Sequence, residues 1–91
     1  MTDAEEPWND FARALGVALL RARAERGLSQ EQVAHAAGLA TFTYRKLEKD
    51  ESNPGTPANP RLRTLVNLAE VLGVPLHDLL PVPPEGIAPG R

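Results

Sequence analysis

One group of side chains near the middle of this 91-residue chain has residue types and spacing that could do chemistry. Phe42, Arg45, Lys46 and Lys49 follow the pattern i, i+3, i+4, i+7, so a helix would place all four on one face. Arg and Lys can contact phosphates or guanine edges, and Phe42 can touch a thymine methyl group. The pattern favours an anionic, grooved partner; an ordinary solvated helix face is the alternative.

The other groups of ionisable side chains are too small to form a reaction centre. Glu31 and His35 lie four residues apart and His77 precedes Asp78, but two potential ligands are too few for a metal site. The sequence has no cysteine, no set of nucleophile, base and orienting residue, and no glycine loop that could cradle a phosphate. We therefore expect a protein that is not an enzyme and uses no cofactor and no metal.

The segment Leu28 to Asp50, LSQEQVAHAAGLATFTYRKLEKD, must position the cationic face. Ser29 can cap the start of a helix, and Gln32 can complete a capping box. Gly38 ends this helix, as expected where the chain needs a positive φ. A second helix then runs from about Thr41 to Lys49. Two short helices joined by a glycine turn are typical of a helix-turn-helix, which presents its second helix to the DNA major groove.

Three further helices are expected around this pair. A first helix from about Trp8 to Arg26 carries an apolar stripe and is followed by a glycine. Asn59 can cap a later helix that has Pro60 at its first position and runs to Leu72. A short last helix covers about residues 75–80.

These elements predict a single small domain at residues 8–80. We expect residues 1–7 to be a disordered acidic N-terminus and residues 81–91 to be a flexible proline-rich tail. The proline- and glycine-containing residues 53–57 read as a surface loop. No apolar run approaches the ~18 residues of a membrane span and the N-terminus is acidic, so a cytoplasmic protein is the default expectation.

The quoted segment is similar to the helix-turn-helix of the Cro/repressor-type regulators, often called the XRE family. The resemblance extends from about Leu15 to Leu80. LGVALLRARAERGLSQ resembles the family's first helix running into its second, and LRTLVNLAEVLGVPLHDLL resembles its fourth and fifth helices. The resemblance implies an all-α fold, a compact five-helix repressor-type DNA-binding domain that docks as phage repressors do.

Carried over position by position, the resemblance implies a role for individual residues. Ser29 and Gln30 match positions that touch DNA phosphates, and Arg23 and Glu48 match a structural Arg–Glu pair. The expected DNA-binding set comprises Ser29, Gln30, the base-reading positions Thr41, Phe42 and Lys46, the flanking contacts Thr43 and Arg45, and Lys49 of the cationic face. The matching core positions are Leu15, Leu19, Val33, Leu39, Tyr44, Leu47, Leu65, Leu68 and Leu72.

Several positions depart from the family pattern. Ala40 stands where the family often has a capping Ser or Thr, so Thr41 could cap instead and would then be lost to base reading. Asp50 stands where a glycine is usual, although Asp tolerates a left-handed conformation at some cost. Phe42 is unusual at a groove-facing position, and the connection at residues 50–59 is longer than in the phage proteins.

The net charge of −2 at first argues against a nucleic-acid partner, but the charge is unevenly distributed. Residues 1–10 carry −4, residues 11–49 carry seven cations and three anions, and residues 50–91 carry −2. The expected DNA-binding half is therefore the basic part of the chain. Because few phosphates would be neutralised, binding to DNA of unrelated sequence should be weak.

The leading hypothesis is a sequence-specific DNA-binding transcriptional regulator, most simply a repressor, that binds double-stranded DNA as a homodimer. One recognition helix covers only about 4–6 base pairs, and two half-sites about 34 Å apart supply the missing selectivity. The family resemblance implies a dimer surface near the last helices, where the candidates for an apolar patch are Leu76, Leu79, Leu80 and Val82. One alternative is an antitoxin that neutralises a toxin. Another is a protein-interaction module without DNA binding, which the negative charge and Phe42 favour slightly.

Overall fold

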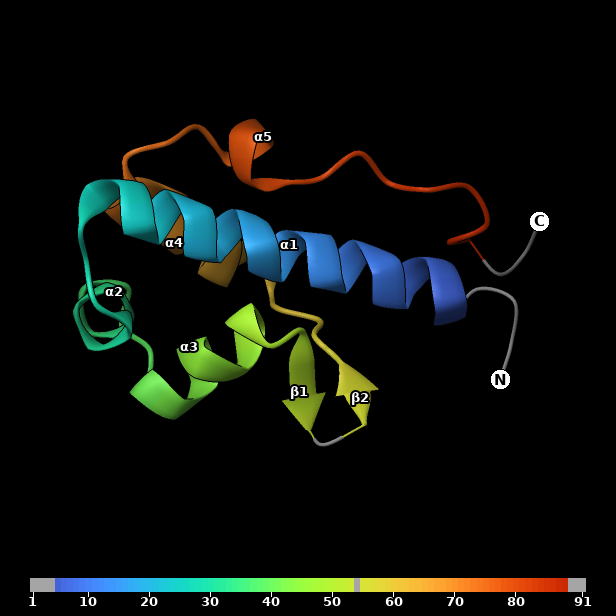
Figure 1. Cartoon of the computed structure of the whole chain (residues 1–91), viewed down its shortest axis with the longest axis horizontal. Helices are drawn as coiled ribbons and strands as arrows, with labels where there is room; N and C mark the ends of the chain where they lie inside the picture. The colour runs from blue at the N-terminus through green and yellow to red at the C-terminus, as the bar shows by residue number, and fades with distance from the viewer. Residues whose placement is uncertain (1–4, 54, 89–91) are drawn as a thin grey trace.

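The computed structural model describes residues 5–53 and 55–88. Five helices surround one core, and a small hairpin lies between the third and fourth (Figure 1). In chain order the elements are α1 (Glu5–Arg26), α2 (Gln30–Ala36), α3 (Thr41–Glu48), β1 (Glu51–Asn53), β2 (Thr56–Pro57), α4 (Leu62–Leu72) and α5 (Leu76–Leu79). The predicted five-helix fold is confirmed.

The long helix α1 is the element against which the rest of the domain packs. Its C-terminal half contacts α3, α4 and α5, and Figure 1 shows the hairpin beneath its N-terminal half. α1 begins at Glu5, three residues earlier than predicted, because Pro7 needs no N–H donor in the first turn and carboxylates are favourable at a helix N-terminus. Residues 5–7 of the expected disordered N-terminus are therefore helical, and residues 1–4 lie outside the described residues.

The core consists of leucines and alanines with one valine and one tyrosine. Eight of the predicted core positions are buried, and Leu39 is partly buried against them. Buried alanines complete the core and let the helices approach closely. The buried set is Ala12, Leu15, Leu19, Val33, Ala34, Ala37, Tyr44, Leu47, Ala58, Leu65, Leu68, Ala69, Leu72 and Leu79.

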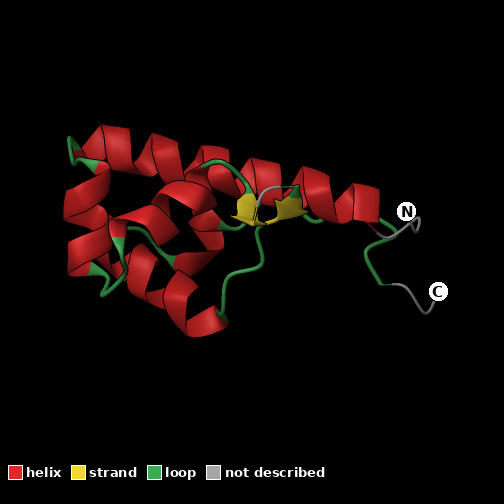
Figure 2. Ribbon diagram, turned by 90° about the horizontal axis from the view of Figure 1, so that it is seen from below, coloured by secondary structure: helices red, strands yellow, loops and turns green. Residues whose placement is uncertain are grey.

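The connection after α3 is a hairpin, so the prediction of a plain loop at residues 53–57 was wrong. Asp50 adopts the expected left-handed conformation, with φ of 58°, and turns the chain out of α3. β1 and β2 then pair antiparallel, and the Ala58 N–H donates to the Asp50 carbonyl at 2.8 Å to close the hairpin base. Figure 2 shows the hairpin beside α1, where the Trp8 indole N–H donates to the Ala58 carbonyl at 3.1 Å.

This anchoring of Ala58 also shifts the start of α4. The predicted cap at Asn59 was wrong: the residue before α4 is Arg61, which is extended (φ −69°, ψ 151°) and makes no side-chain capping bond. Held by Trp8 and Asp50, the chain stays extended past Pro60 before it can turn into the helix. The predicted end of α4 is confirmed, because Gly73 is left-handed with φ of 71°. α5 is shorter than expected, at Leu76–Leu79.

Beyond α5, residues 81–88 run without regular structure back along α1 toward its N-terminus (Figure 1). Gly86 approaches the start of α1, since a Cβ atom placed on it would lie 3.6 Å from the Pro7 ring. Within the described residues, no helix is both long and apolar enough to cross a bilayer.

Candidate nucleic-acid interface

The start of α2 is fixed by two reciprocal hydrogen bonds. The Gln32 backbone N–H donates to the Ser29 hydroxyl at 3.0 Å, and the Ser29 N–H donates to the Gln32 side-chain oxygen at 2.8 Å. This arrangement is the predicted capping box. It leaves Ser29 exposed at the surface of the domain, immediately before Gln30.

The turn between α2 and α3 sets the angle of the second helix. Gly38 is left-handed, with φ of 75°, and the Leu39 N–H donates back to the Ala34 carbonyl at 2.8 Å. Ala40 is the extended residue that precedes α3, and it offers no side-chain cap. The idea that Thr41 might cap α3 is therefore wrong: Thr41 is the first helical residue and stays available on the helix surface.

The two faces of α3 differ sharply in environment. Tyr44 and Leu47 are buried in the core, whereas the Phe42 side chain is 68% exposed and does not pack on α1. Among the predicted contacts, Thr43, Arg45 and Lys49 are exposed and Lys46 is half-buried. The Lys46 Nζ lies 4.9 Å from the centre of the Phe42 ring, within the range of a cation–π contact.

The predicted Arg–Glu pair ties α3 to α1. Arg23 donates from Nε and Nη2 to the two carboxylate oxygens of Glu48 at 2.6 and 3.1 Å, and from Nη1 to the Leu28 carbonyl at 3.0 Å. Burial alone would raise the pKa of Glu48, but the hydrogen bonds from Arg23 and Gln30, together with the positive charge of Arg23, outweigh burial and lower it. The hydrogen bond with Glu48 raises the pKa of Arg23 despite burial. Both groups are therefore charged at neutral pH.

Gln30 extends this ion pair to the exposed surface, which the sequence interpretation missed. Its Nε2 donates to Glu48 at 2.9 Å, and its Oε1 accepts from the Arg45 Nε at 3.2 Å. The carboxylate can only accept, so it fixes which end of the amide faces inward and which end faces Arg45. Gln30 is 18 positions from Glu48 and 15 positions from Arg45, so no local sequence pattern could have revealed these hydrogen bonds.

α1 also comes unusually close to the end of α3. A Cβ atom at Gly16 would lie 2.7 Å from the Glu48 carbonyl oxygen and 3.0 Å from that of Leu47. These partners are backbone atoms and cannot rotate away. Only glycine permits this close crossing, so α3 can take its position against α1 only if residue 16 is a glycine.

A cavity of about 350 Å³ separates α3 from the start of α4. Thr43 and Lys46 line it from α3, and Arg61, Asn59 and Thr64 line it from the other side. Arg61 is thereby brought near the cationic face. The sequence interpretation missed this residue, although a cation next to a predicted helix start was a usable indication.

Comparison with known proteins supports the interpretation that this part of the chain is a helix-turn-helix. The sequence model of the helix-turn-helix family matches residues 19–79, well over half of the chain. The chain belongs to the helix-turn-helix family. The predicted resemblance to Cro/repressor-type regulators is thus confirmed, and α3 is the second helix of the helix-turn-helix.

The chain is also similar to a transcriptional repressor and to a controller protein. The chain is 41% identical over 58 residues to the cryptic phage CTXphi transcriptional repressor RstR of Vibrio cholerae, a match that covers 64% of this chain and 47% of the repressor. It therefore spans about half the length of that relative. The crystal structure of the restriction-modification controller protein C.AhdI from Aeromonas hydrophila matches with a TM-score of 0.66 and 28% identity, covering 76% of this chain and 96% of that chain.

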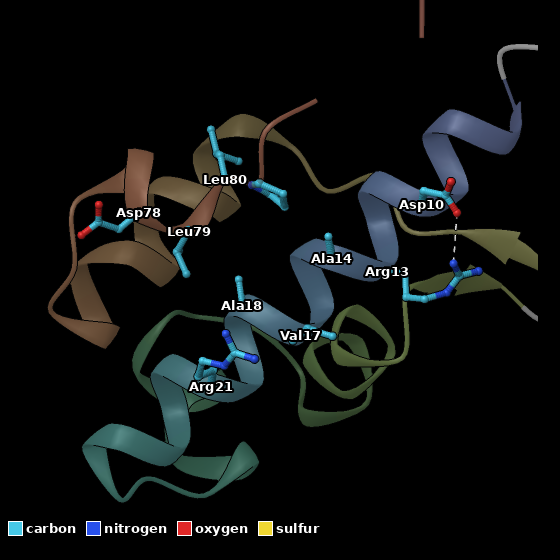
Figure 3. Close-up of a pocket in the computed structure, with 10 residues that line it drawn as sticks. Asp10, Arg13, Ala14, Val17, Ala18, Arg21, Asp78, Leu79 and Leu80 are labelled. Carbon is cyan, nitrogen blue, oxygen red and sulfur yellow. Dashed lines mark hydrogen bonds and ion pairs between the residues drawn. The ribbon is translucent and has the colours of Figure 1, made fainter. Parts of the chain in front are cut away.

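A larger cavity, of about 540 Å³, lies on another part of this helix-turn-helix domain, between α1 and α5 (Figure 3). Val17, Ala18 and Leu80 give it apolar walls, and no residue of α2 or α3 lines it. It therefore does not belong to the candidate interface. Within residues 5–53 and 55–88, no group of three or more His, Asp or Glu side chains is placed to hold a metal ion.

Most of the apolar residues predicted to form a dimer surface are not exposed in the helix-turn-helix domain. Leu79 is 1% exposed and belongs to the core, so it cannot contribute to a dimer surface. Leu76 and Leu80 are partly buried against the same core, and only Val82 of the four candidates is strongly exposed. α4 instead presents Leu62 and Val66, which lie one turn apart and are exposed.

Proposed function

We propose that this chain is a sequence-specific DNA-binding transcriptional repressor that inserts α3 into the major groove. The observation that carries the proposal is the division of α3 into two faces. Tyr44 and Leu47 fix one face in the core, while Phe42, Arg45 and Lys49 project from the other. Membership of the helix-turn-helix family and the similarity to the repressor RstR support the same conclusion.

Within this proposal, the side chains at the start of α3 read bases. Thr41, Phe42 and Lys46 would contact base edges, while Thr43, Arg45 and Lys49 would contact the backbone or flanking bases. These assignments are carried over from the family resemblance, and all six side chains are exposed or half-buried on α3.

Ser29 and Gln30 would contact phosphates beside the groove. Gln30 can do so without releasing its partners, because an amide nitrogen carries two hydrogens and Glu48 takes only one. Its oxygen would meanwhile keep the Arg45 guanidinium close to the groove edge.

We propose further that the repressor acts as a homodimer. One recognition helix covers about 4–6 base pairs, too few to select one site in a genome, and a two-fold dimer would place two helices about 34 Å apart. Leu62 and Val66 of α4 are exposed apolar residues one helical turn apart, and they are the candidates for joining two copies.

A binding selection from a pool of random DNA duplexes at about 100 mM salt tests the proposal, since affinity depends on salt. Enrichment of a two-fold symmetric site would support the dimeric repressor. Enrichment of a single short site would keep DNA recognition and remove the homodimer. If a protein shown to be folded enriches nothing, DNA recognition is wrong, and an antitoxin or protein-interaction role becomes the better explanation.

A further inference from the structure

Phe42 and Lys46 form a mixed apolar and cationic unit on the exposed face of α3. They lie one helical turn apart, and the ammonium sits 4.9 Å from the centre of a ring that is 68% exposed. A cation held over an aromatic face gives the two side chains a shared orientation. They would therefore meet any partner of α3 together.

The charge around the ring indicates which kind of partner it meets. Arg45 and Lys49 share its side of the helix with Lys46, and the nearest carboxylate on α3, Glu48, is turned inward to Arg23. An apolar protein surface would leave the exposed cations Arg45 and Lys49 without a counter-charge. A nucleic-acid groove compensates them and also offers one apolar group that a phenyl ring can contact.

That group is the C5-methyl of a pyrimidine. In the major groove, thymine presents a methyl group, and guanine presents the acceptors N7 and O6. A phenyl ring can donate no hydrogen bond of ordinary strength, so the methyl is the feature it can distinguish. An ammonium has three donors and no acceptor, and it therefore suits guanine.

The spacing of the pair fits neighbouring base pairs. Successive bases along a strand are separated by about 3.4 Å along the helix axis. The 4.9 Å between the ammonium and the ring centre exceeds one such step and falls short of two. Two groups so placed can contact the two bases of one step with a modest sideways offset.

We propose that Phe42 and Lys46 together read one base step, in which a C5-methylated pyrimidine adjoins a guanine. Phe42 contacts the methyl, and Lys46 donates to both guanine O6 and N7. This inference rests on the proposed DNA-binding function and names the feature that sets its sequence preference. Thymine and 5-methylcytosine carry the same methyl group, and base analogues distinguish them.

The test uses the duplex obtained from the random-pool selection and changes single atoms in it. Replacing thymine by uracil at the candidate step removes only the methyl, and should weaken binding about fourfold, the factor for one buried methyl-sized group. Replacing guanine by 7-deazaguanine removes the N7 acceptor and should weaken binding at least about fivefold. In a duplex with cytosine at the pyrimidine position, methylating that cytosine should strengthen binding by a similar factor of about four.

Protein variants connect these effects to the two side chains. Phe42→Ala should bind the thymine and uracil duplexes equally, and Lys46→Ala should lose the distinction between guanine and 7-deazaguanine. Leu20→Ala is the matched control, because Leu20 on α1 is also an exposed apolar residue, at 47%, and has no proposed contact with DNA or with a second copy. It should keep both ratios even if its overall affinity changes. Because Phe42 is exposed, the thermal melting curve of Phe42→Ala should match that of the unaltered chain.

The outcomes distinguish a failure of the methyl-reading role from a failure of DNA recognition itself. If the selection yields a site but uracil substitution has no effect at any position, the methyl-reading role is wrong while DNA recognition stands. The same holds if the uracil effect persists in Phe42→Ala. If no duplex is selected, the proposed function fails and this inference fails with it.

Discussion

The Arg23 guanidinium holds the Glu48 carboxylate through two hydrogen bonds of 2.6 and 3.1 Å, although the residues are 25 positions apart. Glu48 belongs to α3, and its side chain is only 4% exposed. The pair therefore links the placement of that helix to α1. Gln30 carries the link onward to Arg45 at the surface.

Removing Arg23 should destabilise the fold. In Arg23→Ala the Glu48 carboxylate stays buried without its counter-charge, and such losses cost about 3–5 kcal/mol of the free energy of unfolding. Urea denaturation measures this cost. Arg13→Ala is the matched control, because its pair with Asp10 is largely exposed and should contribute less than about 1 kcal/mol. Equal effects of the two substitutions would contradict the structural role of the Arg23–Glu48 pair.

The same pair should make stability depend on pH on the acid side. The pKa of Glu48 is lowered in the folded chain, so the unfolded chain binds the proton more readily. The contribution of Glu48 is present above the unfolded pKa, about 4.3, and is lost as pH falls through the lower folded value. Denaturation followed from pH 6 to about pH 3 should show a steeper fall for the unaltered chain than for Glu48→Gln. Parallel curves would show that Glu48 is not the responsible group.

Gly16→Ala should lower the stability of the fold, whereas a change from glycine to alanine within a helix usually raises it. In an exposed helix interior this change stabilises by about 1 kcal/mol. Here the new Cβ would lie 2.7 Å from the Glu48 carbonyl oxygen, so α1 and α3 must separate, at about 1–3 kcal/mol. Ala14→Gly, at an exposed site on the same helix, should follow the ordinary propensity and cost about 1 kcal/mol. A rise in melting temperature for Gly16→Ala would refute the close crossing.

Lys46 and Lys49 should affect DNA binding in different ways. Lys46→Ala should relax preference at one base position and weaken binding by about 1–3 kcal/mol. Lys49→Ala should weaken binding to all sequences alike and reduce the salt slope by about one. Titrations of matched and mismatched duplexes at several salt concentrations separate the two patterns. A uniform loss for Lys46→Ala would reassign Lys46 to a phosphate contact.

The parts of this fold that local rules govern could be predicted from the sequence. The Ser29–Gln32 capping box and the left-handed Gly38 depend on neighbouring residues, and both were predicted correctly. The Arg23–Glu48 pair is long-range and was predicted only through the family resemblance.

What the sequence did not predict depends on contacts between distant segments. The Trp8 indole reaches Ala58 across 50 positions, and this contact delays the start of α4 against the local preference of Asn59 and Pro60. The orientation of Gln30 likewise depends on where α3 places Glu48. Helical patterns predict which face of a helix is buried, but they do not predict which side chains meet across two helices.

The most direct test of the central claim is to map the DNA-contacting face by NMR, following backbone amide signals of the labelled chain as the selected duplex is added. The account predicts that the largest shifts occur across Thr41–Lys49 and at Ser29 and Gln30, with small changes along the α1–α5 cavity (Figure 3). Shifts concentrated on α4 or α5, with α3 unaffected, would contradict the assignment of α3 as the helix that reads DNA.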